Sequence, residues 1–240
     1  MLIAENISRK IDGQDILKNI SLSVEKGKIT TIIGPSGAGK TTLLRTLSLL
    51  DYPDSGKITW DDKNYRFPVS DKKFHPAWPK VTVVFQQLFI WPHLTLRQNI
   101  LLPLGNITAE HTAHLKELVD IFDMGAFIDR YPNETSLGQR QRAAIVRALM
   151  LNPEYLLLDE ITSSLDVEQI NSILSHLKVV KERGVGILMV THLVNFAQQV
   201  SDNVIFIDGG EIIEFGGVEI LKSPKHERVQ KFLSVIKAVS

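Results

Sequence analysis

Short apolar runs alternate with segments that carry leucine and other apolar residues at helical spacing along this chain. Strands are predicted at short apolar runs, of which 28–34 is rich in β-branched residues; the runs are 28–34, 80–85, 155–159, 185–191 and 203–207. Helices are predicted where the apolar positions follow a helical period, as in residues 40–50 and 167–182. Because strands and helices alternate, we predict an α/β fold with a mostly parallel sheet and helices on its faces.

Two further regions depart from this alternation. From about residue 87 to residue 152 the strand signals fade and helical signals dominate, notably at 109–122 and 138–151. This predicts a helical subdomain of about 87–152, inserted into a single domain that spans residues 1–240. The short strands "KITW" and "NYRF" around the polar turn "DDKN", together with a hairpin turn at "DGG", predict an antiparallel β portion.

Composition narrows the class of protein. Hydrophobic residues make up 44% of the 240 residues, which is enough for a sizeable core. Lysine plus arginine equals aspartate plus glutamate at 27 each, so no net charge attracts the chain to nucleic acid, and we expect no nucleic-acid partner. The absence of cysteine excludes disulfides and thiol chemistry. No apolar run approaches the roughly 18 residues of a membrane span, so we expect a membrane role only through partners.

The stretch "GPSGAGKT", residues 34–41, fits the pattern G-x-x-x-x-G-K-S/T between a predicted strand and a predicted helix. Glycines in such a loop let backbone N–H groups curl around phosphate oxygens. Lys40 can reach the β- and γ-phosphates, and Thr41 offers a hydroxyl to Mg²⁺. The alternative is a glycine-rich loop with a purely structural role.

The run "YLLLDE", residues 155–160, places two acids at the end of a buried strand. Ligands gather at the carboxyl edge of open α/β sheets. Asp159 can bind Mg²⁺ through water, and Glu160 can orient or deprotonate a water molecule. The alternative is a strand that ends in two solvated carboxylates.

The stretch "TSLGQRQRAA", residues 135–144, precedes a predicted helix and allows two interpretations. Ser136 is a good N-cap and Gly138 leaves the backbone open to a close ligand. One interpretation is a capped surface helix. The other is an anion site, because a helix start offers free N–H groups and the positive end of the dipole. The apolar Leu137 complicates both.

The order of these motifs resembles that of the nucleotide-binding subunit of an ABC transporter, over nearly the whole chain. "GPSGAGKTT" resembles the Walker A motif and "YLLLDE" the Walker B motif. "VVFQQ" resembles the Q-loop with Gln86, "TSSLD" the D-loop with Asp166, and "VTHL" the H-loop with His192. "TSLGQRQR" falls where the family has its signature, commonly L-S-G-G-Q.

The resemblance implies an ATPase with ATP and Mg²⁺, in which a second copy of the chain pairs head to tail and two ATP molecules lie between the copies. Catalytic roles fall to Glu160, His192 and Gln86. Metal contacts fall to Thr41, Gln86 and Asp159. The residues implied to contact nucleotide are Ile11, Gly34, Pro35, Ser36, Gly37, Ala38, Gly39, Lys40, Thr41, Thr42, Ser136, Gly138, Gln139 and Asp166.

Three positions depart from the family pattern. Ile11 stands where the family usually has an aromatic residue that stacks on adenine, a contact worth about 1–3 kcal/mol. Ile161 replaces the proline that usually follows the catalytic glutamate, with little expected effect. Leu137 replaces the first signature glycine, and Thr135 the usual leucine, so we expect an altered but active site.

The resemblance further implies integral membrane permease subunits, a solute-binding protein and a location on the cytoplasmic face of the cell (inner) membrane. The permease groove is expected to include parts of residues 88–100. Length, the "FQQ…PHLT" stretch and the tail "SPKHERVQKFL" resemble polar amino-acid uptake ATPases. Two alternatives stay open: an ATP-gated clamp on membrane partners, as in cell division, and a catalytically weak ATP-binding module. His111 and His114 are spaced for a metal, but the solvated helix face is the favoured interpretation.

Overall fold

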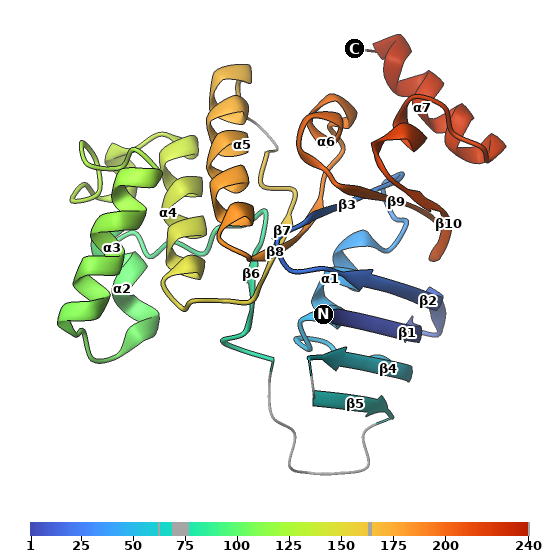
Figure 1. The fold of residues 1–240 in the computed structure, drawn as a ribbon, viewed down its shortest axis with the longest axis horizontal. Coiled ribbons are helices and arrows are strands. Elements are labelled where there is room, and N and C mark those ends of the chain that lie inside the picture. Colours follow the sequence, from blue (N-terminus) through green and yellow to red (C-terminus); the bar gives the residue numbers. More distant parts are fainter. Residues whose placement is uncertain (62, 69–76, 163–164, 240) are drawn as a thin grey trace.

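The computed structural model describes residues 1–61, 63–68, 77–162 and 165–239, and its centre is a mostly parallel sheet (Figure 1). The strand order in this sheet is β10-β9-β3-β8-β7-β6, and only β10 runs antiparallel to its neighbour. Its strands are β3 (Ile29–Ile33), β6 (Val81–Val84), β7 (Tyr155–Asp159), β8 (Gly186–Val190), β9 (Asn203–Asp208) and β10 (Glu211–Gly216). Strands β3, β7 and β8 are buried at every position, which explains their continuous apolar sequence.

A second, antiparallel sheet has the order β2-β1-β4-β5. Its strands are β1 (Leu2–Ile11), β2 (Gln14–Val24), β4 (Ser55–Trp60) and β5 (Lys63–Phe67). One apolar cluster joins the inner face of this sheet to helix α1 (Lys40–Leu47) and to one face of the parallel sheet. The predicted antiparallel portion is therefore present, and it covers the side of the molecule on which α1 lies.

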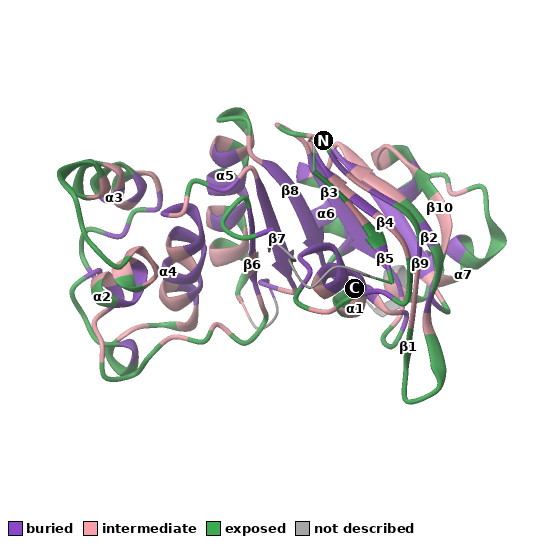
Figure 2. Ribbon diagram, turned by 90° about the horizontal axis from the view of Figure 1, so that it is seen from below, coloured by how far each residue is buried: buried purple, intermediate pink, exposed green. Residues whose placement is uncertain are grey.

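The segment between β6 and β7 is helical. It contains α2 (Leu96–Leu101), α3 (Ala109–Ile121) and α4 (Leu137–Leu149), with short 3₁₀ turns at Leu102–Leu104 and Pro132–Glu134. These helices gather at one end of the molecule in both ribbon views (Figures 1 and 2). A single buried cluster runs from them through α5 (Val167–Glu182) to the second face of the parallel sheet. The predicted fold class, with a mostly parallel sheet, an antiparallel portion and an inserted helical part, is confirmed.

The remaining elements complete the side of the molecule opposite to the inserted helices. Helix α6 (Val194–Val200), the 3₁₀ turn Val218–Leu221 and helix α7 (Glu227–Val239) pack beside β9 and β10. Figure 2 shows the central strands β3, β7 and β8 as buried, whereas the edge strand β10 is more exposed. Among the described residues, no helix has the length and apolar character that crossing a membrane requires.

Strand register decides which residues meet at the carboxyl edge of the parallel sheet. Ile32 pairs with Val190, and Val190 pairs with Asp159. Because β3, β8 and β7 are parallel, the segments that follow these three strands begin at the same edge of the sheet. The glycine-rich loop, the two acids at the end of β7 and the histidine after β8 therefore emerge next to one another, at the edge where open α/β sheets bind ligands.

Candidate active site

The loop between β3 and α1 is shaped by glycine. A Cβ atom added to Gly34 would lie 2.0 Å from the carbonyl oxygen of Ile207, so no other residue fits there. Gly39 caps α1 with a φ of 95°, in the left-handed region, and its Cβ would meet the carbonyl oxygen of Ile16 at 2.8 Å. The loop therefore runs directly into the start of α1, where free backbone N–H groups favour an anion.

Lys40 is buried at the start of α1 and points back into the loop. Its ammonium group donates hydrogen bonds to the carbonyl oxygens of Gly34 at 3.0 Å and Pro35 at 2.9 Å. Burial lowers the pKa of Lys40, while the carboxylates of Glu160 and Asp159 act in the opposite direction. The result is a desolvated cation at the start of a helix, a combination that favours a bound anion.

Thr41 and Asp159 are in direct contact at the edge of the sheet. The Thr41 hydroxyl donates a hydrogen bond to Oδ1 of Asp159 at 3.1 Å. Burial raises the pKa of Asp159 above its usual value, and this effect outweighs the Thr41 hydrogen bond, which lowers it. Two oxygen donors side by side, one of them a poorly solvated carboxylate, suit a hard divalent cation such as Mg²⁺.

Glu160 and His192 face each other across the edge formed by β7 and β8. The Nε2 atom of His192 lies 2.5 Å from Oε1 of Glu160. The backbone N–H of Glu160 donates to the carbonyl oxygen of Val190, which fixes the first residue after β7 to the end of β8. The pair is therefore held by the sheet itself, next to the glycine-rich loop.

Lys40, Thr41, Glu160 and His192 line one open cavity of about 390 Å³. The full lining is Ile16, Ser36, Gly37, Gly39, Lys40, Thr41, Thr42, Glu160 and His192. Ile16, on β2, is a lining residue that the sequence motifs did not indicate. Ile11, the predicted adenine contact, ends β1 with 39% of its surface exposed and does not line this cavity. Ile11 stays a prediction, whereas Ile16 contributes a large apolar side chain to the lining of the cavity.

The signature-like segment forms the start of α4, at a distance from this cavity. Ser136 is the N-cap, as predicted: its hydroxyl accepts from the N–H of Gln139 at 3.2 Å, and Gln139 accepts from the N–H of Ser136 at 3.0 Å. Gly138 is buried, and Leu137 is half-buried. None of these residues lines the cavity beside Lys40.

Asp166 is the N-cap of α5. Its Oδ1 atom accepts a hydrogen bond from the N–H of Gln169 at 2.8 Å, and its side chain is exposed. The D-loop prediction also covers Ser163 and Ser164, which lie outside the described residues. Gln86 follows β6 at the same edge of the sheet and is exposed, but it does not line the cavity beside Lys40.

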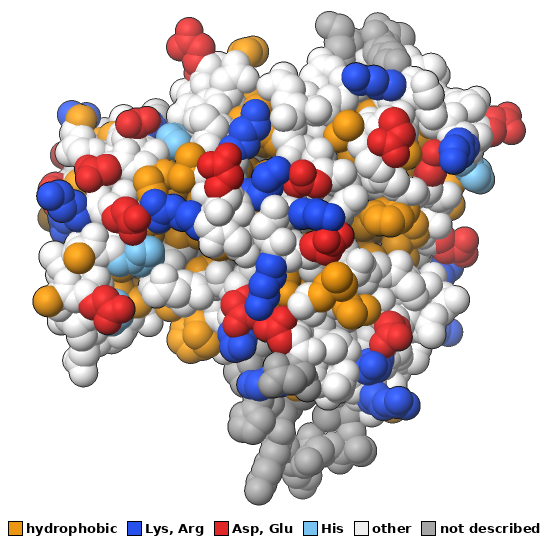
Figure 3. Space-filling model, viewed as in Figure 1, with side chains coloured by type: hydrophobic (Ala, Val, Ile, Leu, Met, Phe, Trp, Pro, Cys, Tyr) orange, Lys and Arg blue, Asp and Glu red, His pale blue; other side chains and the backbone are white. Residues whose placement is uncertain are grey.

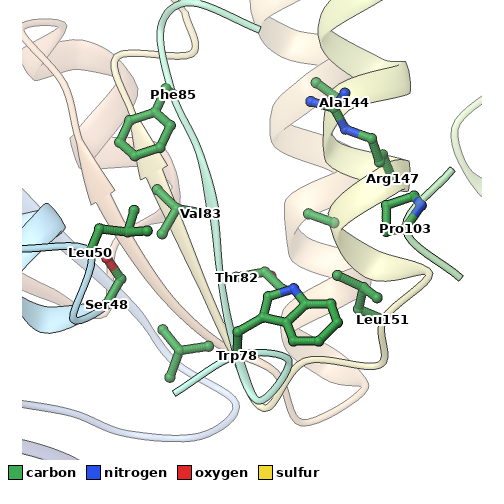
Figure 4. A pocket seen from close by; sticks show the side chains of 12 residues that line it. Ser48, Leu50, Trp78, Thr82, Val83, Phe85, Pro103, Ala144, Arg147 and Leu151 are labelled. Atoms are coloured by element: carbon green, nitrogen blue, oxygen red, sulfur yellow. The ribbon is translucent and has the colours of Figure 1, made fainter. Parts of the chain in front are cut away.

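A second cavity, of about 270 Å³, lies between β6 and α4 (Figure 4). Its walls include Phe85 and Val83 on one side and Ala144 and Arg147 on the other. The full lining is Ser48, Leu50, Trp78, Val81, Thr82, Val83, Phe85, Pro103, Ala144, Arg147, Ala148 and Leu151. We call this cavity the β6–α4 groove.

None of the lining residues of this groove belongs to residues 88–100, and the expectation that parts of that segment contribute to the permease groove stays a prediction. Residues 88 and 89 are connected to the groove through one of its lining residues, Arg147. The guanidinium of Arg147 donates to the carbonyl oxygens of Leu88 at 2.6 Å and Phe89 at 2.8 Å. Arg147 thus joins the chain that follows Gln86 to helix α4.

The two histidines of α3 have local partners. His111 completes a capping box with Thr108, and Nδ1 of His114 lies 3.5 Å from the Glu117 carboxylate. Among the residues described, no three or more histidine, cysteine or acidic side chains gather as metal ligands would.

Lysine, arginine and acidic side chains are interspersed over the face shown in Figure 3.

Comparisons with known proteins show the family of this chain. The family model described as ABC transporter matches residues 17–163. The L-cystine import ATP-binding protein TcyC of Bacillus subtilis (strain 168) is 39% identical over 98% of this chain and 98% of its own. The arginine transport ATP-binding protein ArtM of the same organism is 38% identical over 98% and 100% of the two chains. The glutamine transport ATP-binding protein GlnQ of Escherichia coli (strain K12) is 37% identical over 97% and 98%.

Solved structures give the same result. A dimeric structure of a bacterial ABC transporter cassette is 31% identical, with a TM-score of 0.79 over 91% of this chain and 99% of that one. A post-hydrolysis state of that cassette, bound to ADP and Pi, is 30% identical with a TM-score of 0.78. The glycine-rich loop, the buried Lys40 and the acids after β7 define a P-loop ATPase. Within that class the chain belongs to the ABC transporter family, and the predicted resemblance is confirmed.

Proposed function

We propose that this chain is the ATP-hydrolysing subunit of a membrane importer of polar amino acids. The observation that carries the proposal is the gathering of Lys40, Thr41, Glu160 and His192 around one cavity, with Asp159 beside it. The proposed cargo class is supported by the relatives, which are named for the import or transport of cystine, arginine and glutamine. These relatives favour import over the alternative of a cell-division clamp.

Phosphate binding is assigned to the glycine-rich loop, from Gly34 to Thr42. Its backbone N–H groups and the start of α1 would receive the β- and γ-phosphates. The ammonium group of Lys40 donates hydrogen bonds to two carbonyl oxygens of its own loop. When ATP binds, these hydrogen bonds would be replaced by hydrogen bonds to phosphate oxygens, which are stronger acceptors because they carry charge.

Mg²⁺ is assigned to Thr41 and Asp159, with Gln86 as a further ligand from the end of β6. The residues fit the metal, because a hydroxyl and a buried carboxylate already lie 3.1 Å apart. When bound, Mg²⁺ would neutralise charge on the β- and γ-phosphate oxygens.

Glu160 and His192 are assigned to the hydrolytic step. Water attacks the γ-phosphorus, its oxygen forms the new P–O bond, and the bond to the β–γ bridging oxygen breaks, leaving ADP and phosphate. Glu160 accepts the proton from the water as general base. The Nε2 atom of His192, which follows the neighbouring strand β8, lies 2.5 Å from Oε1 of Glu160. His192 would hold Glu160 in place and contact the γ-phosphate.

A second copy of the chain is needed to complete the site. Ser136, Gly138, Gln139 and Asp166 do not line the cavity beside Lys40 of their own chain. In a head-to-tail pair the start of α4 would offer its N–H groups to the γ-phosphate held by the partner. The pairing is supported by the dimeric cassette at 31% identity.

Permease subunits are the proposed partners at the membrane. The β6–α4 groove offers exposed apolar side chains, including Leu50 and Trp78, each 55% exposed, at the junction between the sheet and the inserted helices. A helix from a permease would fill this groove, and the chain would sit on the cytoplasmic face of the membrane through that contact alone. A solute-binding protein would deliver the amino acid from the other side.

Reconstitution tests the proposal. The chain is copurified with its membrane subunits, inserted into vesicles, and supplied with ATP and labelled L-cystine, L-arginine or L-glutamine. ATP-dependent uptake of at least one of them is expected, and it should be lost with Lys40→Ala. ATP turnover by the complex without uptake of any polar amino acid would favour the clamp, and negligible turnover would favour a weak binding module.

Dilution tests the composite site. Because a single chain holds only half of each site, ATP turnover per chain should rise with protein concentration for the chain without its permease. Turnover per chain that stays constant down to dilute protein would mean that one chain carries a complete site.

A further inference from the structure

Asn99, on α2, is fully buried, and its side chain pairs with the backbone of the loop at residues 91–95. Its Oδ1 atom accepts a hydrogen bond from the N–H of Trp91 at 2.7 Å, and its amide group donates to the carbonyl oxygen of the same residue at 3.0 Å. The amide group also donates to the carbonyl oxygens of Leu94 at 3.1 Å and Thr95 at 2.9 Å. One side chain therefore holds both ends of this loop.

The pairing between Asn99 and Trp91 depends on a side-chain amide. The backbone of Trp91 offers one donor and one acceptor, and the amide meets both of them. An ionised aspartate at position 99 would have no donor, and a leucine would have neither group. Because a buried amide is costly unless it is hydrogen-bonded, the side chain and the loop keep each other in one arrangement.

The segment that is held in this way carries exposed aromatic side chains. Trp91 is 52% exposed and Phe89 is 59% exposed. The backbone of Phe89 is anchored too, because the guanidinium of Arg147 donates to its carbonyl oxygen at 2.8 Å. Exposed aromatic side chains on an anchored loop are typical of a protein-binding surface, where tryptophan often contributes most of the affinity.

The two aromatic side chains are continuous with the β6–α4 groove. Phe85 lines the groove, and its ring meets the ring of Phe89 edge to face, with the centroids 6.1 Å apart. Arg147, which holds Phe89, lies on the wall of the groove that faces Phe85 (Figure 4). A partner segment that fills the groove can therefore extend over Phe89 to Trp91.

We infer that Asn99 is a positioning residue that holds Trp91 in place for contact with the permease, and that Phe89 and Trp91 extend the docking surface beyond the β6–α4 groove. The inference rests on the proposed function, in which a permease helix fills that groove. The two rings fit apolar side chains of the same permease segment. Asn99 itself is buried and acts only through the backbone of residues 91–95, so its loss weakens docking without removing a contact with the permease.

The affinity of the chain for its permease tests the inference. The membrane subunits that copurify with the chain are separated from it, placed in lipid nanodiscs and titrated with labelled chain. Trp91→Ala should raise the Kd by about tenfold or more, because interface tryptophans are frequent hot spots. Asn99→Ala keeps the Trp91 side chain but frees its backbone, and a rise in the Kd of about threefold to tenfold is expected.

A double-mutant cycle separates positioning from folding. Because Asn99 acts through Trp91, Asn99→Ala should raise the Kd by no more than about twofold in a chain that already carries Trp91→Ala. The matched controls are Asn106→Ala and Phe215→Ala, both at exposed positions, and they should leave the Kd unchanged. Trp91→Ala alters an exposed side chain, so it tests the surface even if Asn99→Ala fails to fold.

Three results would overturn the inference. Wild-type affinity of Trp91→Ala would mean that the permease does not reach Trp91. Wild-type affinity of Asn99→Ala, or losses that multiply in the double variant, would mean that Asn99 does not act through Trp91. Leu50→Asp, in the groove, is measured alongside. If it abolishes docking while Trp91→Ala does not weaken it, the inference alone fails, whereas docking that survives both variants rejects the permease contact of the proposed function.

Discussion

The hydroxyl of Thr41 donates a hydrogen bond to the carboxylate of Asp159 across 3.1 Å, joining the residue after the P-loop lysine to the last residue of β7. Thr41 and Asp159 lie 118 positions apart in the sequence. The parallel register of β3, β8 and β7 brings them together. The proposed metal site is therefore built by the sheet.

Asp159→Asn is predicted to stabilise the chain without nucleotide and to abolish its response to Mg²⁺. Burial raises the pKa of Asp159, so the folded chain binds a proton on this carboxylate more strongly than the unfolded chain does. The ionised carboxyl therefore costs stability near neutral pH, and that cost disappears as the pH falls through the raised pKa. Thermal unfolding should give a higher Tm for Asp159→Asn near neutral pH, with a smaller difference in acid.

The control for this prediction is MgATP. It should raise the Tm of the wild-type chain and leave that of Asp159→Asn nearly unchanged, because the variant lacks the charged metal ligand. A lower Tm for Asp159→Asn without nucleotide, or full stabilisation of the variant by MgATP, would contradict the assignment.

Arg147→Lys is predicted to loosen the segment after Gln86. The guanidinium donates to two successive carbonyl oxygens, of Leu88 and Phe89, and a lysine cannot reproduce this forked geometry. Hydrogen bonds from charged groups contribute about 1.5–3 kcal/mol, so a loss of about 1–3 kcal/mol in the free energy of unfolding is expected from denaturant titration. Arg130→Lys, at an exposed position, should change it little. Equal stability of the two variants would show that the Arg147 bridge is dispensable.

Ile11→Tyr is predicted to tighten ATP binding. If Ile11 occupies the adenine-stacking position, a new aromatic stack of about 1.4 kcal/mol would lower the apparent Kd by up to roughly tenfold. Titration with a fluorescent ATP analogue measures this change, and Ile107→Tyr, also exposed, serves as the matched control. An unchanged Kd would place the adenine elsewhere, with Ile16 as the next side chain to replace.

Leu137→Gly is predicted to leave ATP turnover within a few-fold of wild type. Leu137 is half-buried beside the N-cap, and the assigned contacts come from Ser136 and the Gly138 backbone. The added glycine should cost up to about 1 kcal/mol of local order, which favours a small loss. A hundredfold gain in the ATPase rate of the complex would instead reveal a degenerate natural site, and would favour the binding-module alternative.

The sequence pattern predicted the long and strongly apolar elements of the fold. Buried apolar runs such as the β-branched 29–33 and the leucine-rich 155–159 became strands, and the alternation of strands with helices predicted the parallel sheet. Helices α2 and α6 were not predicted, because six or seven residues are too few to show a helical period. A capping box of Thr95 and Gln98 marks the start of α2, whereas α6 has no side-chain cap and is fixed by its buried face.

Site residues with a local motif were predictable, whereas residues that act through distant contacts were not. The P-loop and the acids after β7 each lie in one short stretch. Ile16 and Arg147 have no motif of their own. Their significance lies in contacts with residues far away in the sequence, such as the hydrogen bonds from Arg147 to the carbonyl oxygens of Leu88 and Phe89, and these appear only when the elements are packed.

Replacement of Glu160 by glutamine tests the central claim most directly. The amide keeps the size of the side chain and its place opposite His192, but it cannot accept a proton from water. ATP affinity and steady-state ATP turnover are measured for wild type and Glu160→Gln in the same complex. The predicted result is wild-type affinity with turnover lower by several orders of magnitude, and an ATP-bound dimer that persists on a sizing column. Turnover close to wild type would contradict the assignment of Glu160 as the general base.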